Sequence, residues 1–178
     1  MFGLFWGCAA PDPRTLRDMS PPHGIDVPHD TELGERLRVL INEVRQAHGA
    51  AVLANDTMLQ RIASRHSADM VQRGFFDHQN PDGNGPLERL LALDPTFEGR
   101  VAENLFALLP PQGREAVDMA PEIVSGWMNS PRHRHALIDG DYARTGIGFA
   151  FKGREIYVTQ IFVTSQAPLR RDGSASWQ

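Results

Sequence analysis

The chain has a single cysteine, Cys8, among its 178 residues. No intrachain disulfide can form, so packing alone must hold the folded part together. Cys8 also lies in a leader-like segment at the N-terminus. A cysteine nucleophile in the folded domain is therefore excluded.

Long apolar runs are absent as well, since no stretch approaches the roughly 18 residues that a membrane-spanning helix needs. Positive charge is not in excess, because the formal net charge is −4, and this argues against a general nucleic-acid partner. Hydrophobic residues make up 41% and charged residues 22% of the chain, values typical of one globular domain. We expect this domain to be a monomer.

Common catalytic signatures are missing too. The sequence has no G-x-S-x-G elbow, no Walker-type loop, no dinucleotide fingerprint and no H-E-x-x-H pair. Sequence motifs alone therefore assign no enzyme class, and we favour a protein that is not an enzyme.

The N-terminus carries a short apolar run, MFGLFWG, directly before Cys8. Residues 1–8 resemble the end of a lipoprotein signal, in which the cysteine becomes the acylated first residue. The run is short and lacks a basic start, so either the coding start lies upstream or the match is accidental. We favour lipidation of Cys8, with residues 9–30 as a proline-rich linker. The domain at 31–164 would then be held at the cell envelope, outside the cytoplasm, with a polar tail at 165–178.

Hydrophobic periodicity gives the order of elements. Apolar residues recur at helical spacing from Thr31 to Gly49 and again from Asn55 to Gly74. The remaining expected elements are a helix at 86–93, a strand at 101–108, helices beginning near 121 and 130, and two strands joined by a turn at Lys152-Gly153. Helices followed by mostly antiparallel strands predict an α+β fold.

Two histidines stand close together in WMNSPRHRHALI, residues 127–138. Ser130 and Pro131 have the residue types of a helix N-cap and first helical position. Residues two apart on a helix point about 200° apart, so His133 and His135 cannot both bind one ion. At most one of them faces a site.

Other polar residues stand where an apolar pattern does not predict them. Glu103 lies inside an apolar strand, where a carboxylate costs several kcal/mol unless it is paired. Asn104 follows it, His78 lies in a loop, and Glu122 lies in the first turn of a helix. Two histidines and a carboxylate could bind Zn²⁺ or act as acid and base. His66, on an apolar helix face, is better interpreted as a hydrogen-bonded core residue than as a ligand.

Six stretches together resemble bacterial CAP domains (SCP/PR-1-like) from about Leu33 to Val163. They occur in the family's order and spacing: HSADM, FFDHQNPDG, AENL, WMNSPRHRHALI, TGIGFAF and YVTQIFV. The resemblance implies a three-layer α-β-α sandwich with a mostly antiparallel central sheet. It also implies a large groove lined by two histidines and two acidic residues.

Carried over residue by residue, the resemblance places His78 and Glu103 in that groove. Ala102 precedes Glu103 where the family has glycine. His133 matches the second histidine, in the bacterial S-P-x-H form. The family's second acid falls on Ser130; either Glu122 substitutes for it or the cluster has one acid. Zinc or another divalent ion bound by His78 and His133 is the metal that the resemblance implies.

Three functions stay open at this point. The favoured one is an envelope-tethered module whose groove binds a small apolar or glycan ligand derived from the envelope. The second is a zinc-dependent hydrolase of peptide or envelope polymer, with Glu103 as base or as the partner of a ligand histidine. The third is a structural or interaction role in which the polar cluster stabilises the fold.

Overall fold

The computed structural model describes residues 32–165, and its centre is a four-stranded sheet in the order β1-β3-β4-β2. The strands are β1 (Ala54–Asn55), β2 (Val101–Leu108), β3 (Tyr142–Lys152) and β4 (Glu155–Thr164). β2, β4 and β3 pair antiparallel, and only the short β1 pairs parallel, with β3. β2 is thus an edge strand of the sheet.

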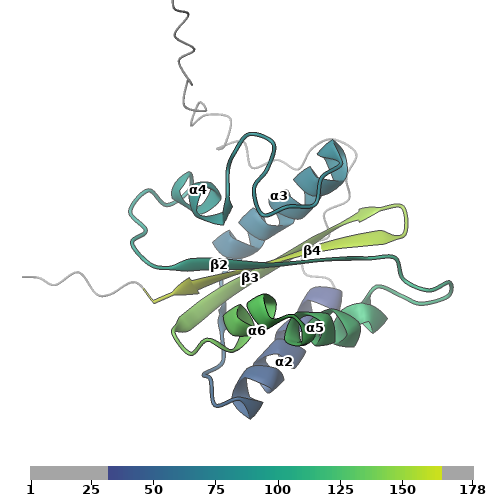
Figure 1. Cartoon of the computed structure of the whole chain (residues 1–178), viewed down its shortest axis with the longest axis horizontal. Helices are drawn as coiled ribbons and strands as arrows, with labels where there is room; N and C mark the ends of the chain where they lie inside the picture. The colour runs from purple at the N-terminus through teal and green to yellow at the C-terminus, as the bar shows by residue number, and fades with distance from the viewer. Residues whose placement is uncertain (1–31, 166–178) are drawn as a thin grey trace, which may run out of the picture.

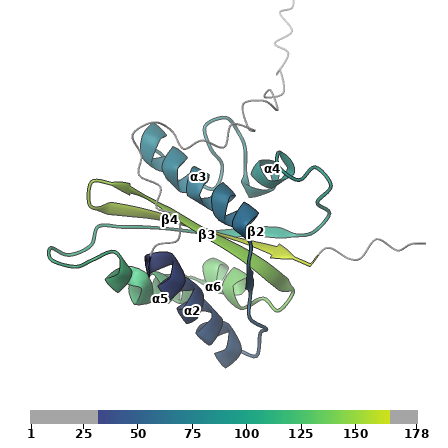
Figure 2. The same cartoon turned by 180° about the vertical axis from the view of Figure 1, so that it is seen from behind.

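Helices cover both faces of the sheet, as Figures 1 and 2 show. α3 (Thr57–Arg73) and α4 (Pro86–Leu91) lie on one face. The other face carries α2 (Glu32–Ala47), the short η1 (Val117–Met119), α5 (Ala120–Asn129) and α6 (Pro131–Ile138). The predicted α-β-α sandwich is confirmed. No helix within residues 32–165 is both long and apolar enough to cross a membrane.

Several predictions lie outside the described residues: the lipidated Cys8, the linker at 9–30, the Thr31 cap and the tail beyond Ser165. The predicted hairpin turn is displaced by one residue. Lys152 still pairs with Glu155, so the turn consists of Gly153 and Arg154. Gly153 adopts a positive φ of 60°, which glycine reaches without steric cost, and so it occupies the first turn position.

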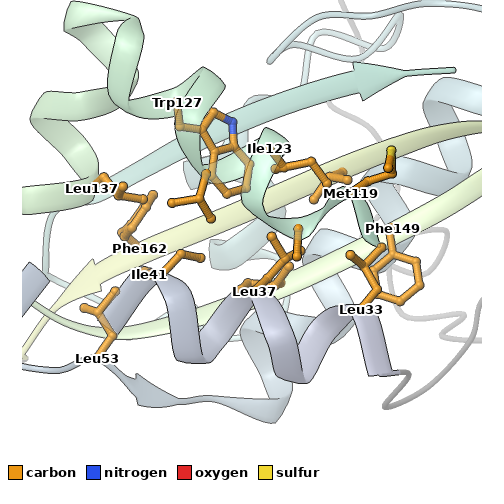
Figure 3. Packing of buried hydrophobic residues seen from close by; sticks show 14 of the residues in the cluster. Leu33, Leu37, Ile41, Leu53, Met119, Ile123, Trp127, Leu137, Phe149 and Phe162 are labelled. Carbon is orange, nitrogen blue, oxygen red and sulfur yellow. The ribbon is translucent and has the colours of Figure 1, made fainter. Parts of the chain in front are cut away.

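The larger core lies between the sheet and the helices α2, α5 and α6 (Figure 3). Trp127 is fully buried there, and its indole N–H donates to the backbone oxygen of Leu105 at 3.0 Å. This bond fixes α5 to the edge strand β2. Leu37, Ile41 and Phe162 pack in the same cluster.

A buried arginine joins α2 to the end of α6. The Arg45 guanidinium donates to the backbone oxygens of Ala51, Leu137, Asp139 and Tyr142 at 2.8–3.1 Å. Burial lowers the Arg45 pKa below its ordinary value, while the Asp139 carboxylate opposes this effect. Four carbonyl partners satisfy the buried guanidinium, and they hold the C-terminal end of α6 in place.

Candidate functional site

Glu103 projects from β2 toward the face of the sheet that α3 and α4 cover. Its side chain is only 1% exposed. Arg89 of α4 donates to Oε2, and Nδ1 of His78 lies 2.9 Å from Oε1. The buried carboxylate that the sequence left unexplained is therefore paired with a guanidinium and hydrogen-bonded to an imidazole, which offsets its desolvation.

His78 lies in the loop that follows α3, with 51% of its side chain exposed. A carboxylate can only accept a hydrogen bond, so Nδ1 of His78 carries the hydrogen and Nε2 is the acceptor nitrogen of the neutral ring. Arg89 also donates to the backbone oxygens of His78 and Asn84, at 2.9 and 3.1 Å. One arginine thus holds both the buried carboxylate and the loop that presents His78.

His66 of α3 lies beneath this pair and is 1% exposed. Its Nε2 donates to the backbone oxygen of Asp77 at 2.9 Å and lies 3.9 Å from Oε1 of Glu103. Burial lowers the His66 pKa, with the Glu103 charge opposing and the Arg89 charge reinforcing the shift. His66 is therefore neutral near pH 7, the hydrogen-bonded core histidine that the apolar pattern predicted.

His133 approaches from the opposite face of the sheet, on α6. The Asn104 side-chain amide donates to the backbone oxygen of His133 at 3.1 Å, which fixes α6 against β2. Burial lowers the His133 pKa, and the nearby His78 lowers it further. Within residues 32–165 the His133 side chain forms no hydrogen bond or ion pair with His78 or Glu103, and the Asn104 bond is what joins α6 to the strand that carries Glu103. His135 is exposed, in agreement with the helix argument that at most one histidine faces a site.

Two further candidates stay apart from the cluster. Ser130 is the residue before α6, but its side chain forms no capping hydrogen bond. Glu122 is exposed in the first turn of α5, and within residues 32–165 it forms no hydrogen bond or ion pair with His78, Glu103 or His133. Of the two acids that the sequence suggested, Glu103 and Glu122, only Glu103 contacts a candidate histidine, His78.

Sequence reasoning missed Arg89 and placed His66 only in the core. Arg89 is 9% exposed and lies in the segment PLERLL, whose pattern predicts only a short helix. The available signal was a buried carboxylate in β2 that required a cationic partner. The sequence does not show which arginine supplies it.

The donor set does not fit a zinc centre built on three protein ligands. Within the described chain, no group of three or more His, Cys, Asp or Glu side chains is arranged to hold a metal ion. Both oxygens of Glu103 already accept from Arg89 and His78. The imidazoles of His78 and His133 alone provide fewer protein ligands than catalytic zinc sites use.

Because His66 is buried, we predict that the protein loses stability in mild acid. The pKa of His66 in the folded protein lies below the ordinary value of 6.5. As the pH falls, the His66 imidazole is therefore protonated in the unfolded chain at a higher pH than in the folded protein. This contribution is fully present above pH 6.5 and decreases below it, by at most about 1.4 kcal/mol per pH unit. Urea denaturation at several pH values between 5 and 7.5 measures this slope.

The matched variant for this prediction is His66→Gln, whose amide nitrogen can still donate to Asp77. We expect a smaller slope in the variant below pH 6.5. Part of the slope should persist, because the His133 pKa is lowered in the same direction. Identical slopes in wild type and variant would show that His66 does not carry the effect.

Comparison with known proteins gives consistent matches. The family model described as "CAP: Cysteine-rich secretory protein family" matches residues 39–164. The uncharacterized membrane protein YlbC of Bacillus subtilis is 33% identical over 124 residues, covering 70% of this chain and 32% of YlbC. The match thus spans about a third of that relative.

Two solved structures resemble this fold. An outer surface protein from Borrelia burgdorferi matches with a TM-score of 0.67 and 22% identity, covering 80% of this chain and 99% of that one. An extracellular SCP-domain protein from Bacillus anthracis matches with a TM-score of 0.59 and 25% identity, covering 74% and 40%. The fold, the ordered motifs and the family match agree, and the chain belongs to the CAP family of cysteine-rich secretory proteins.

Proposed function

We propose that this CAP-domain protein is an extracytoplasmic ligand-binding module, tethered through Cys8, whose ligand site is the cluster of His78, Glu103 and His133. The names of the outer surface protein and the extracellular SCP-domain protein support a location outside the cytoplasm. The ligand is a small molecule with apolar or glycan character, derived from the envelope.

The observation that carries this proposal is a half-exposed histidine held by a buried carboxylate. Arg89 already provides Glu103 with a buried ion pair, so a purely structural cluster would not need His78. The Nδ1 bond instead fixes the ring and makes its Nε2 available as an acceptor. His133 approaches from the other layer of the sandwich, so a bound ligand would contact both layers.

An apolar surface close to His78 in the chain supports an apolar part in the ligand. Phe76 is 52% exposed and packs edge-on against Tyr157, with ring centroids 6.2 Å apart. The two rings form one small continuous aromatic surface, and continuous exposed apolar surface is what marks a binding groove. We favour binding over hydrolysis, because Ser130 replaces the family's second acid and the donor set does not fit a zinc centre.

The test is to extract purified protein with organic solvent and identify co-purifying molecules by mass spectrometry. We expect a ligand in wild type that is reduced about tenfold or more in His78→Ala and in His133→Ala. The matched control is His135→Ala, on the exposed side of the same helix, which should retain the ligand. Replacing His78 removes a hydrogen bond to the buried Glu103 carboxylate and should cost about 1.5–3 kcal/mol of stability, so circular dichroism first confirms that each variant is folded. Wild-type protein without ligand across several preparations, or equal loss in His135→Ala, would contradict the proposal.

A further inference from the structure

The outer edge of β2 has no strand beside it within residues 32–165. β2 closes one end of the sheet order β1-β3-β4-β2 and pairs only with β4. In Figure 1 it crosses the view between α4 above and α5 and α6 below. An edge strand presents a row of backbone N–H and C=O groups with which another chain can pair.

Two hydrogen bonds show which backbone groups of β2 point away from the sheet. The Thr164 N–H donates to the Arg100 oxygen at 3.1 Å, so this group of Arg100 faces β4. Backbone groups of successive residues in an antiparallel strand point in alternate directions. The odd-numbered residues of β2 therefore point outward. The Leu105 oxygen agrees, because it accepts from the Trp127 indole at 3.0 Å and not from β4.

The accessible part of this edge is its C-terminal end. Glu103 and Leu105 are at most 9% exposed, whereas Ala107 is exposed and Leu109, directly beyond the strand, is 61% exposed. Within the described chain, neither the outward backbone groups of Ala107 nor those of Leu109 form a hydrogen bond. These groups can therefore pair with the backbone of a partner.

An apolar surface adjoins the unpaired groups. Ala107 lies opposite Tyr157 in the sheet register, so both side chains point to the same face. Thr159, two residues along β4, lies on that face as well, because its hydroxyl bonds to Ser67 of α3 at 2.8 Å. The Tyr157 ring packs edge-on against Phe76, which is 52% exposed. In a strand added beside Ala107, every second side chain would lie next to this surface.

We infer that the C-terminal end of β2 binds an extended peptide segment of another protein, which adds a strand to the sheet. Its alternate side chains are apolar and contact the surface formed by Phe76, Ala107 and Tyr157. Backbone hydrogen bonds give such an interaction its affinity, and contacts with alternate side chains give its specificity. The side chains of the proposed ligand cluster take no part, so this inference goes beyond the proposed function and does not rest on it.

An extended segment fits this edge better than a second folded copy or the chain's own tail. The middle of β2 is almost fully buried between the two helix layers, so the edges of two folded copies could not meet along their length. The tail begins after Ser165, beside Arg100 at the opposite end of β2. Its sequence, QAPLRRDGSASWQ, contains proline, aspartate and glycine, which are depleted in strands.

The test is an NMR titration and hydrogen exchange of the full chain with a short peptide of alternating valine and threonine, with lysine at each end. Without peptide, the Ala107 amide should exchange rapidly, whereas the amides of Phe106 and Leu108, which face β4, should exchange slowly. Saturating peptide should slow exchange at Ala107 about tenfold or more. Two further peptides, N-methylated on the valines or on the threonines, separate backbone pairing from side-chain contact. Only one of them should bind, because alternate amides of an added strand face β2.

Ala107→Pro tests the same contact from the protein side. Proline removes an N–H that points away from β4, so the existing sheet loses no hydrogen bond. We expect peptide binding about tenfold weaker or worse. The matched control, Ala107→Val, keeps the N–H and should bind within about threefold of wild type. Circular dichroism confirms the fold of each variant, and the N-methylated peptides give the answer even if Ala107→Pro does not fold.

No saturable response in wild type, or equal binding of both N-methylated peptides, would overturn the inference. An Ala107 amide that exchanges slowly without peptide would also overturn it, because another part of this chain or a second copy would then occupy the edge. His78→Ala should still bind the peptide, and loss of binding in the folded variant would place the peptide at the ligand cluster instead. Failure of peptide binding leaves the proposed function standing, since co-purification of a ligand tests that function separately.

Discussion

Replacing Glu103 by glutamine is expected to lower the free energy of unfolding by about 3–5 kcal/mol. The glutamine is close in size to the glutamate, so the loss is mainly electrostatic. The Arg89 guanidinium, 9% exposed, would keep its charge without a counter-charge. It would still donate to the backbone oxygens of His78 and Asn84, but neutral carbonyls offset a buried charge less well than a carboxylate does.

Urea denaturation followed by circular dichroism measures this effect, and a double-mutant cycle isolates the pair. Arg89→Met should also destabilise the protein, because it leaves the Glu103 carboxylate without its cation. Arg89→Met/Glu103→Leu removes both charges and should cost clearly less than the sum of the single variants. A loss below about 1 kcal/mol for Glu103→Gln, or simple additivity in the cycle, would show that the pair does not couple α4 to β2.

The sequence singled out Glu103 and His78 as candidate residues, but it did not predict that Glu103 contacts both His78 and Arg89. The strand predicted at 101–108 is β2. Glu103 and Asn104 could be identified as candidates because they are polar residues within an otherwise apolar strand. Helix periodicity showed that at most one of His133 and His135 faces a site. The choice of His133 came from the family motif.

What the sequence could not show depends on contacts between distant segments. Nothing in the helical pattern marks Arg45 for burial, yet it is fully buried because carbonyls up to 97 positions away converge on it. Arg89 was missed for the same reason, since its carboxylate partner lies on another element. β1 has two residues and no alternation that a pattern could reveal. Ion-pair partners and short parallel pairings follow from the assembled layers, and local periodicity does not encode them.

Close packing of α3 on β3 explains why the motif TGIGFAF contains glycine at 146 and 148. The backbone of α3 packs directly on β3 at the two glycines. A Cβ built on Gly148 would lie 2.0 Å from the backbone nitrogen of Ser64, and one on Gly146 would lie 2.1 Å from that of Gln60. Helix backbone cannot rotate away as a side chain can, so any larger residue must push α3 off the sheet.

We therefore expect Gly148→Ala to cost about 3 kcal/mol or more, at or beyond the upper end of ordinary overpacking. The matched control is Gly34→Ala in α2, where the added Cβ would lie an ordinary 3.6 Å from the Phe149 ring. This second change should stabilise the protein by about 0.5–1 kcal/mol, because alanine loses less entropy than glycine in a helix. Urea midpoints of the two purified variants give the comparison.

If Gly148→Ala does not fold while Gly34→Ala does, the contact is at least as tight as the structure shows. A Gly148→Ala variant as stable as wild type would mean that α3 can shift freely on β3. The loop that follows α3, and with it His78, would then be far less rigidly positioned than the Arg89 contacts indicate.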